Sequence, residues 1–147
     1  MNNNKEVIEV LNNQVAEWTV LFTKLHNYHW YVKGPNFFSL HEKFEELYNE
    51  PSVYIDDIAE RILAIDGNPI ATLQEALEWS EVKEAEKNLS ANQMVEQLSH
   101  NFTTVIGQLE EGIQLAEKLD DEMTGDMLLG METSLEKHNR MLKSFLG

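Results

Sequence analysis

Cysteine is absent from this chain of 147 residues, proline occurs three times, and basic side chains are few. The absence of thiols excludes disulfides and thiolate-bound metals. No apolar run approaches the ~20 residues of a membrane-spanning helix. The first residues, MNNNKE, lack the charged-then-apolar pattern of a secretory signal. We therefore expect a soluble, cytoplasmic protein without a membrane partner.

The shortage of basic residues leaves a strongly acidic chain. Eleven Lys and Arg oppose 26 Asp and Glu, which gives a net charge of −15. Binding to phosphate groups depends on Lys and Arg that release counterions, so direct DNA binding is not expected. The same negative charge would concentrate cations at clefts and pores, and it would equally keep the protein soluble.

Apolar residues recur at steps of three and four along four segments, which is the pattern of amphipathic helices. The first helix is predicted from Lys5 to Val32, where Gly34-Pro35-Asn36 interrupts the pattern. The second, capped by Asn36 or Ser39, is predicted to end near Ile65. There the sequence Asp66-Gly67-Asn68-Pro69 stops it, with Gly67 as the expected C-cap.

The remaining helices are predicted at Ser90–Leu119 and Met123–Leu146. Between Pro69 and Ser90 lies a long connection with a short helical pattern at Leu73, Ala76 and Leu77. Such a length suits a crossover between parallel neighbours in a bundle. The sequence thus predicts an all-α four-helix bundle, with residues 1–147 as one domain.

The stretch from Leu25 to Arg61 carries three of the five histidines and many carboxylates. Carboxylate and imidazole without thiolate form a ligand set for iron, manganese or zinc. His41 and Glu45 are four residues apart, as are Asp56 and Glu60, so each pair shares a helix face. The alternative interpretation is a solvated acidic face, with His29 as a core histidine.

The pair His41 and Glu45 is too far along the helix from the pair Asp56 and Glu60 to bind the same ion. At 1.5 Å per residue, Glu45 and Asp56 are about 16 Å apart along the axis, whereas a metal–ligand bond is about 2 to 2.5 Å. An antiparallel second copy, with a two-fold axis near residues 50 and 51, would bring His41 and Glu45 beside the partner's carboxylates. We therefore predict two equivalent metal sites across a homodimer interface.

None of the five histidines fits the usual di-iron motif, and three of them receive other assignments. Conventional di-iron bundles use Glu-x-x-His within one chain, and no histidine of this sequence has Glu three residues before it. An intra-chain di-iron centre is therefore not expected. His26 is assigned to the surroundings of the site or to the surface, His100 to the surface, and His138 to the core or to a helix cap.

The run from Leu25 to Pro69 resembles the Dps-like mini-ferritins, particularly their Gram-positive branch. The resembling segments are KLHNYHWYVKGPNFF from Lys24, LHEKFEELY from Leu40 and IAERILA from Ile58. The resemblance implies a ferritin-like four-helix subunit in a hollow dodecamer. It also implies Fe(II) oxidation, typically by hydrogen peroxide, at sites between two-fold-related subunits, with storage of ferric mineral inside.

By motif position, the resemblance assigns His29 and His41 of one subunit, with Asp56 and Glu60 of its partner, to iron, with zinc as a substitute metal. Glu45, at a position where the family usually has Asp, would hold a second iron. Further assignments are weaker. Trp30 matches a Trp beside the family's site, Glu42 and Glu46 are candidates for mineral nucleation, and Glu117, Asp121 and Asp126 are candidates for a cation pore.

Several residues depart from the family pattern or admit another interpretation. Pro51 lies mid-helix, where it removes a backbone donor and predicts a bend at a cost of about 3 kcal/mol. Asp66 replaces a usual Gly, and Arg140 a common Trp. The carboxylates near Asp121 would also complement a helix dipole. Two other functions remain open, a non-catalytic divalent-metal buffer and a purely structural helical assembly.

Overall fold

The computed structural model describes residues 4–147, and every regular element in that range is a helix. The predicted all-α fold is confirmed, with helix ends within a few residues of those expected. The helices are α1 (Asn4–Tyr31), α2 (Phe37–Ala64), α3 (Leu73–Trp79), α4 (Ala91–Lys118) and α5 (Glu122–Leu146).

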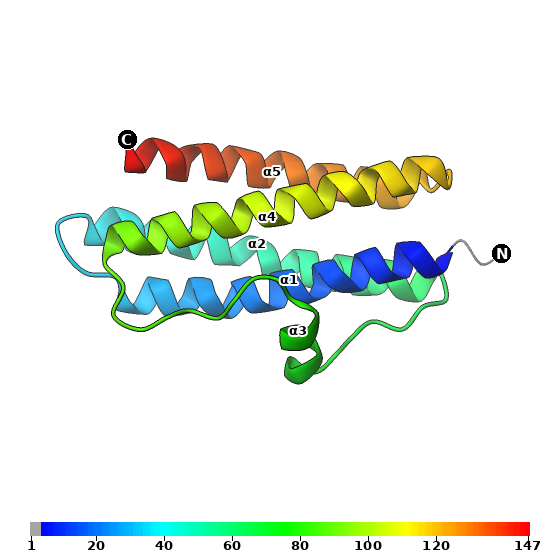
Figure 1. Ribbon diagram of the computed structural model, residues 1–147, viewed down its shortest axis with the longest axis horizontal. Coiled ribbons are helices and arrows are strands. Elements are labelled where there is room, and N and C mark those ends of the chain that lie inside the picture. Colours follow the sequence, from blue (N-terminus) through cyan, green and yellow to red (C-terminus); the bar gives the residue numbers. More distant parts are fainter. Residues whose placement is uncertain (1–3) are drawn as a thin grey trace.

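Two antiparallel helix pairs form the bundle, α1 with α2 and α4 with α5 (Figure 1). Helices α2 and α4 run in the same direction, so the chain between them must return along the length of the bundle (Figure 1). This connection carries α3, which packs against α1. The predicted crossover with a short helix is therefore confirmed.

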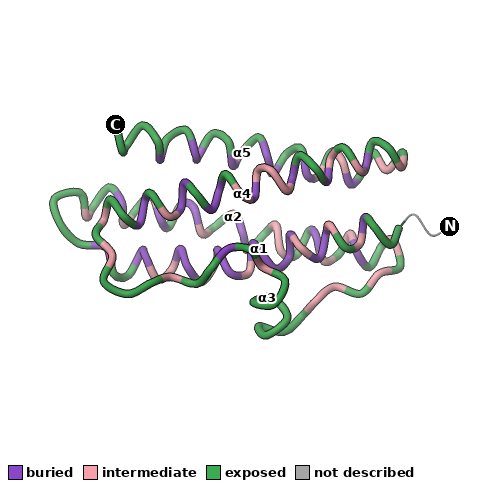
Figure 2. The backbone as a smooth tube through the Cα atoms, in the orientation of Figure 1, coloured by how far each residue is buried: buried purple, intermediate pink, exposed green. Residues whose placement is uncertain are grey.

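The core lies between the helices, where one stripe of each long helix is buried (Figure 2). Burial of such side chains contributes about 1.5 to 3 kcal/mol each, which is the main force that holds the helices together. The largest fully buried apolar side chains are Tyr28, Phe44, Phe102, Leu11, Leu21, Leu25, Ile58, Ile62, Leu98, Leu109 and Leu128.

A buried carboxylate fastens the crossover to the bundle. Glu17 of α1 is 0% exposed and accepts hydrogen bonds from Ser80 Oγ at 2.6 Å and from the backbone amides of Glu81 and Val82 at 3.0 and 3.1 Å. Gln108 Nε2 of α4 donates to the same carboxylate at 2.7 Å. Because buried charges are costly unless they are paired, these donors explain why Glu17 is tolerated in the core.

The end of α2 corrects the expected glycine C-cap. The residue in the left-handed region is Asp66, with φ of 66°. The amide of Gly67 donates to the carbonyl of Ile62 at 2.8 Å and that of Asp66 to Leu63 at 3.0 Å, which together form a Schellman motif. Gly67 is needed for another reason, because a Cβ there would lie 2.7 Å from Ile8 Cδ1.

The start of α2 also differs from expectation. Asn36 is the N-cap residue, but its side chain makes no capping hydrogen bond, and Ser39 Oγ donates to the Asn36 carbonyl at 3.2 Å. Neither predicted side chain therefore caps this helix. By contrast, side-chain oxygens of Thr72, Ser90 and Asp121 cap α3, α4 and α5.

Pro51 lies inside α2, and the helix continues through it from Phe37 to Ala64. Pro51 is buried, so the residue that lacks a backbone donor packs against the rest of the bundle. The bend expected at this position remains a prediction.

Within residues 4–147, no helix combines the length and the apolar character that crossing a membrane requires.

The strain at Asp66 leads to a stability prediction. Replacement Asp66→Gly should raise the free energy of unfolding by about 1 kcal/mol, because glycine adopts a positive φ without the steric cost of a Cβ. Urea unfolding of both proteins measures this difference. As a control, Glu111→Gly at an exposed position inside α4 should lower stability by about 1 kcal/mol. A loss of stability in Asp66→Gly would contradict the assigned strain.

Candidate metal centre

His29 near the end of α1 and His41 near the start of α2 face each other across the turn that joins these helices. Their imidazole rings stack with centroids 3.8 Å apart and planes 12° from parallel. His29 Nδ1 hydrogen-bonds to the carbonyl of His41 at 2.6 Å, and His41 Nδ1 to the carbonyl of His29 at 2.7 Å. The structure thus brings together two of the predicted ligands.

These reciprocal hydrogen bonds determine which nitrogen of each ring carries the proton. A carbonyl oxygen only accepts, so Nδ1 must be the donor in both His29 and His41. In the neutral rings, each Nε2 therefore keeps its lone pair available to a metal ion. A hydrogen bond from the other ring nitrogen is also how proteins usually orient a ligating histidine.

Aromatic side chains surround the histidine pair. Phe37 stacks on His41 with centroids 4.9 Å apart, and Tyr48 meets the edge of His29 at 5.4 Å. The ring of His26 stacks against that of Tyr48 with centroids 3.7 Å apart, and His26 Nδ1 hydrogen-bonds to a backbone carbonyl of α1. His26 therefore lies beside the pair without joining it.

Of the three predicted carboxylates of α2, Glu45 lies about one turn from His41, whereas Asp56 and Glu60 lie about four and five turns from it. Glu45, Asp56 and Glu60 are all exposed, and no ion pair between described residues includes them. Over residues 4–147, they do not form a group of three potential ligands with the histidine pair. One chain thus presents two separated half-sites, and their union across a dimer remains a prediction.

Comparison with known proteins places the chain in a family. The family model described as "Ferritin-like domain" matches residues 8–147. DNA protection during starvation protein 2 of Bacillus anthracis is 59% identical over 143 residues, which cover 97% of this chain and 98% of that protein. The chain belongs to the Dps-like mini-ferritin family.

Solved Dps structures agree with this membership. The crystal structure of Dps from Staphylococcus aureus matches with a TM-score of 0.97 and 60% identity, covering 100% of this chain and 99% of that one. A structure of Listeria innocua Dps soaked with zinc matches with a TM-score of 0.92 and 42% identity, covering 96% and 95% of the two chains. The ferritin-like fold expected for a Dps-like chain is therefore confirmed.

Of the three acidic residues predicted to line a pore in this Dps-like bundle, one makes structural contacts. Asp121 caps α5 through the amide of Thr124 and pairs with Arg61 Nη2 at 2.8 Å. Burial raises the pKa of Asp121, but hydrogen bonds from Thr124 and the charge of Arg61 outweigh it, so the pKa lies below its ordinary value. Glu117 and Asp126 are exposed, and the pore assigned to these residues remains a prediction.

A second polar network joins α2 to α5. His138 is buried, its Nε2 hydrogen-bonds to Glu50, and its Nδ1 accepts from Lys43 Nζ at 3.1 Å. Burial alone would raise the pKa of Glu50. Hydrogen bonds from His138, Ser134 and Tyr54 outweigh this effect and lower the pKa to about 2. His138 thus lies in the core and His100 is exposed.

Glu46, a candidate for mineral nucleation, forms an ion pair with Lys43 at 3.2 Å. Glu42, the other candidate for mineral nucleation, is exposed on the same helix. The side chain of Glu46 is 58% exposed, so water weakens this ion pair and leaves Glu46 able to exchange Lys43 for another cation. The nucleation role of these carboxylates stays a prediction.

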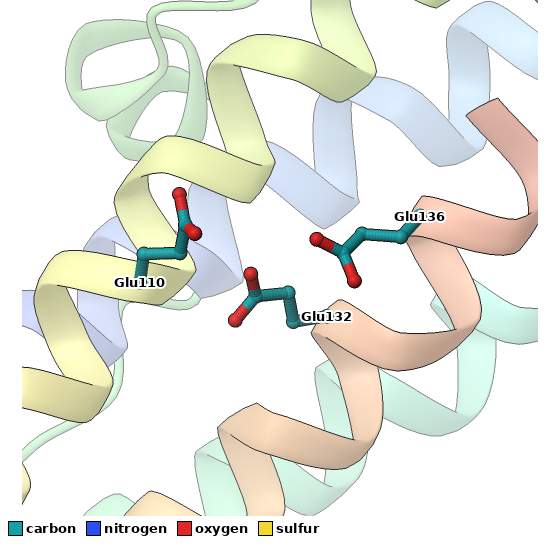
Figure 3. A group of neighbouring side chains, drawn as sticks. All are labelled: Glu110, Glu132 and Glu136. Carbon is teal, nitrogen blue, oxygen red and sulfur yellow. The ribbon is translucent and has the colours of Figure 1, made fainter. Parts of the chain in front are cut away.

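One group of potential ligands was not anticipated from sequence. Glu110, Glu132 and Glu136 converge between α4 and α5 (Figure 3). The spacing of Glu132 and Glu136, four residues apart on a helix, is the same signal that selected His41 and Glu45. Glu110 has no such signal, because only the packing of α4 on α5 brings it to the other two.

Proposed function

We propose that this protein oxidises Fe(II) and stores the ferric product in a hollow dodecameric shell in the cytoplasm. The observation that carries this proposal is the reciprocal pair of His29 and His41, whose Nε2 atoms are oriented and free to bind a metal. The iron is a substrate, and the ligands suit it because imidazole nitrogen and carboxylate oxygen both bind ferrous iron.

The partner subunit would supply the carboxylates. Asp56 and Glu60 lie on one face of α2 together with Val53 and Leu63, at steps of three and four residues. Val53 and Leu63 are 55% and 53% exposed, so apolar side chains flank the carboxylates on both sides along the helix. Exposed apolar groups that border a polar site are typical of a surface that a second protein covers. This arrangement supports a two-fold interface along α2.

The proposed chemistry transfers one electron from each of two Fe(II) ions to hydrogen peroxide. With two water molecules, the products are two FeO(OH) units and four protons, so atoms and charge balance. Carboxylate oxygens are hard ligands and stabilise Fe(III) as it forms. Asp56 and Glu60 would hold one iron with the histidines, Glu45 would hold the second iron, and Glu42 and Glu46 would help to nucleate mineral.

An iron titration tests the oxidation and storage together. Metal-free protein should bind Fe(II) anaerobically, and addition of peroxide should produce ferric absorbance that elutes with a large protein shell in size-exclusion chromatography. Binding without faster oxidation would contradict the proposal and favour a divalent-metal buffer, for example for zinc. Absence of any metal binding would leave only a structural helical assembly.

The shared site can be tested by mixing inactive variants. His41→Gln and Glu60→Gln should each lower the oxidation rate tenfold or more, because each removes a ligand. When the two variants are reassembled together, half of the dimers are mixed and each mixed dimer has one intact site. About a quarter of the wild-type rate should therefore return in a statistical mixture.

A matched control sharpens this mixing experiment. His29→Gln mixed with His41→Gln should restore nothing, because both changes fall in the same half of the site and no intact combination forms. Recovery in this control, or its absence in the mixture of His41→Gln with Glu60→Gln, would show that the ligands do not combine between subunits.

We further infer that any protection of DNA is chemical, through removal of Fe(II) and peroxide. The relative from Bacillus anthracis is named for DNA protection, but this chain carries a net charge of −15 and Lys5 is the only basic residue near its N-terminus. Phosphate binding requires basic contacts. In a gel-shift assay at about 50 mM salt, the assembled protein should leave duplex DNA unshifted, and a shift would refute this inference.

A further inference from the structure

Three glutamates from two helices meet away from the histidine pair. Glu110 lies on α4, and Glu132 and Glu136 lie one turn apart on α5 (Figure 3). One carboxylate oxygen of each residue lies within 4.8 Å of the others. The three side chains belong to one chain, so this cluster is complete without a partner subunit.

The burial of Glu132 is the feature that an ordinary surface cluster does not have. Glu132 is only 8% exposed, and Figure 3 shows its carboxylate directed toward the space between the two other glutamates. Across residues 4–147, no ion pair includes any of the three, although Arg140 follows Glu136 by one turn. Buried carboxylates in proteins are normally paired with a cation or coordinate a metal.

The electrostatics of the cluster agree with a missing positive charge. Three ionised carboxylates with oxygens within 4.8 Å of one another repel at close range. Two species relieve this repulsion, a proton shared within the cluster or a cation bound between the carboxylates.

We propose that Glu110, Glu132 and Glu136 bind a hard divalent cation of the Mn(II) or Fe(II) class between α4 and α5. Carboxylates without imidazole or thiolate select such hard ions. The three carboxylate oxygens lie within 4.8 Å of one another, so small shifts of these side chains would bring all three into contact with one ion. This site does not depend on the iron oxidation proposed above.

Binding at this position would cross-link the two helices of the second pair. Two ligands come from adjacent turns of α5 and the third from α4. The ion would therefore add a link between helices that already meet through apolar packing and through hydrogen bonds of Asn139 with Ser99 and Thr103. Because a ligand that binds only the folded state stabilises it, the metal should raise the melting temperature.

Manganese is the probe that tests this site. The assembled full chain carrying His29→Gln and His41→Gln lacks the histidine ligands, so remaining Mn(II) binding reports on other sites. Electron paramagnetic resonance of free Mn(II) should show that adding Glu132→Gln removes about one bound ion per chain or weakens its binding tenfold or more. Glu111→Gln, an exposed neighbour on α4, is the matched control and should leave the titration unchanged.

Glu132→Gln keeps the shape of the side chain and removes a buried charge, so the variant should fold. Glu110→Gln, at an exposed position, provides a second variant and should weaken Mn(II) binding in the same way. Mn(II) should raise the melting temperature of the double-histidine background but not that of either glutamine variant. Anomalous diffraction at the manganese edge should place a peak between α4 and α5.

Equal Mn(II) binding with and without Glu132→Gln would overturn the proposal. A second result would also overturn it. If Mn(II) does not change the melting temperature of the double-histidine background, and Glu132→Gln raises that temperature in metal-free buffer, the cluster holds a proton instead of a metal. Failure of iron oxidation in the earlier experiment would leave these results unchanged, since the tested background already lacks His29 and His41.

Discussion

Packing of α1 against α2 is the interaction on which the rest of this structure depends. The two helices are antiparallel and share a short turn, so residues twelve apart in sequence lie side by side. Buried Tyr28 and Phe44, with ring centroids 6.1 Å apart, fill the hairpin directly beside His29 and His41. Each histidine is oriented by the backbone of the other, and neither orientation exists until the helices pack.

The length of α2 imposes the second constraint. A helix of 28 residues is a rigid rod, and its rise keeps Asp56 and Glu60 far from the histidine pair at its other end. No side-chain rearrangement within one subunit closes that gap. An ion bound by all four of these residues would therefore require a second copy of the chain.

Carboxylates in and near the core show how the protein tolerates its acidity. Glu17 is held by donors from the crossover and α4, Glu50 by His138 and its neighbours on α2 and α5, and Asp121 by Arg61. In each case the charge also fastens two elements together. Glu132 is buried as Glu17 is, but its carboxylate lies beside those of Glu110 and Glu136, and this contrast distinguishes the cluster on α5 from the surrounding surface charge.

The sequence by itself determined the helices, the crossover and the family. These features follow from local rules, because a period of 3.6 residues and the breakers near residues 34 and 69 act within one segment. It also selected His29 and His41, since the motif that carries them is continuous along the chain. Even so, it assigned the left-handed helix end to Gly67, whereas packing against Ile8 requires glycine there and leaves Asp66 to adopt the positive φ.

Tertiary structure alone decided the contacts between helices. The pairing of Glu50 with His138 and the meeting of Glu110 with Glu132 join residues that are distant in sequence. Such contacts depend on how far each helix is rotated about its axis, and core packing sets that rotation. The spacing of residues along one helix shows which side chains share a face, but only the packed bundle determines what that face meets.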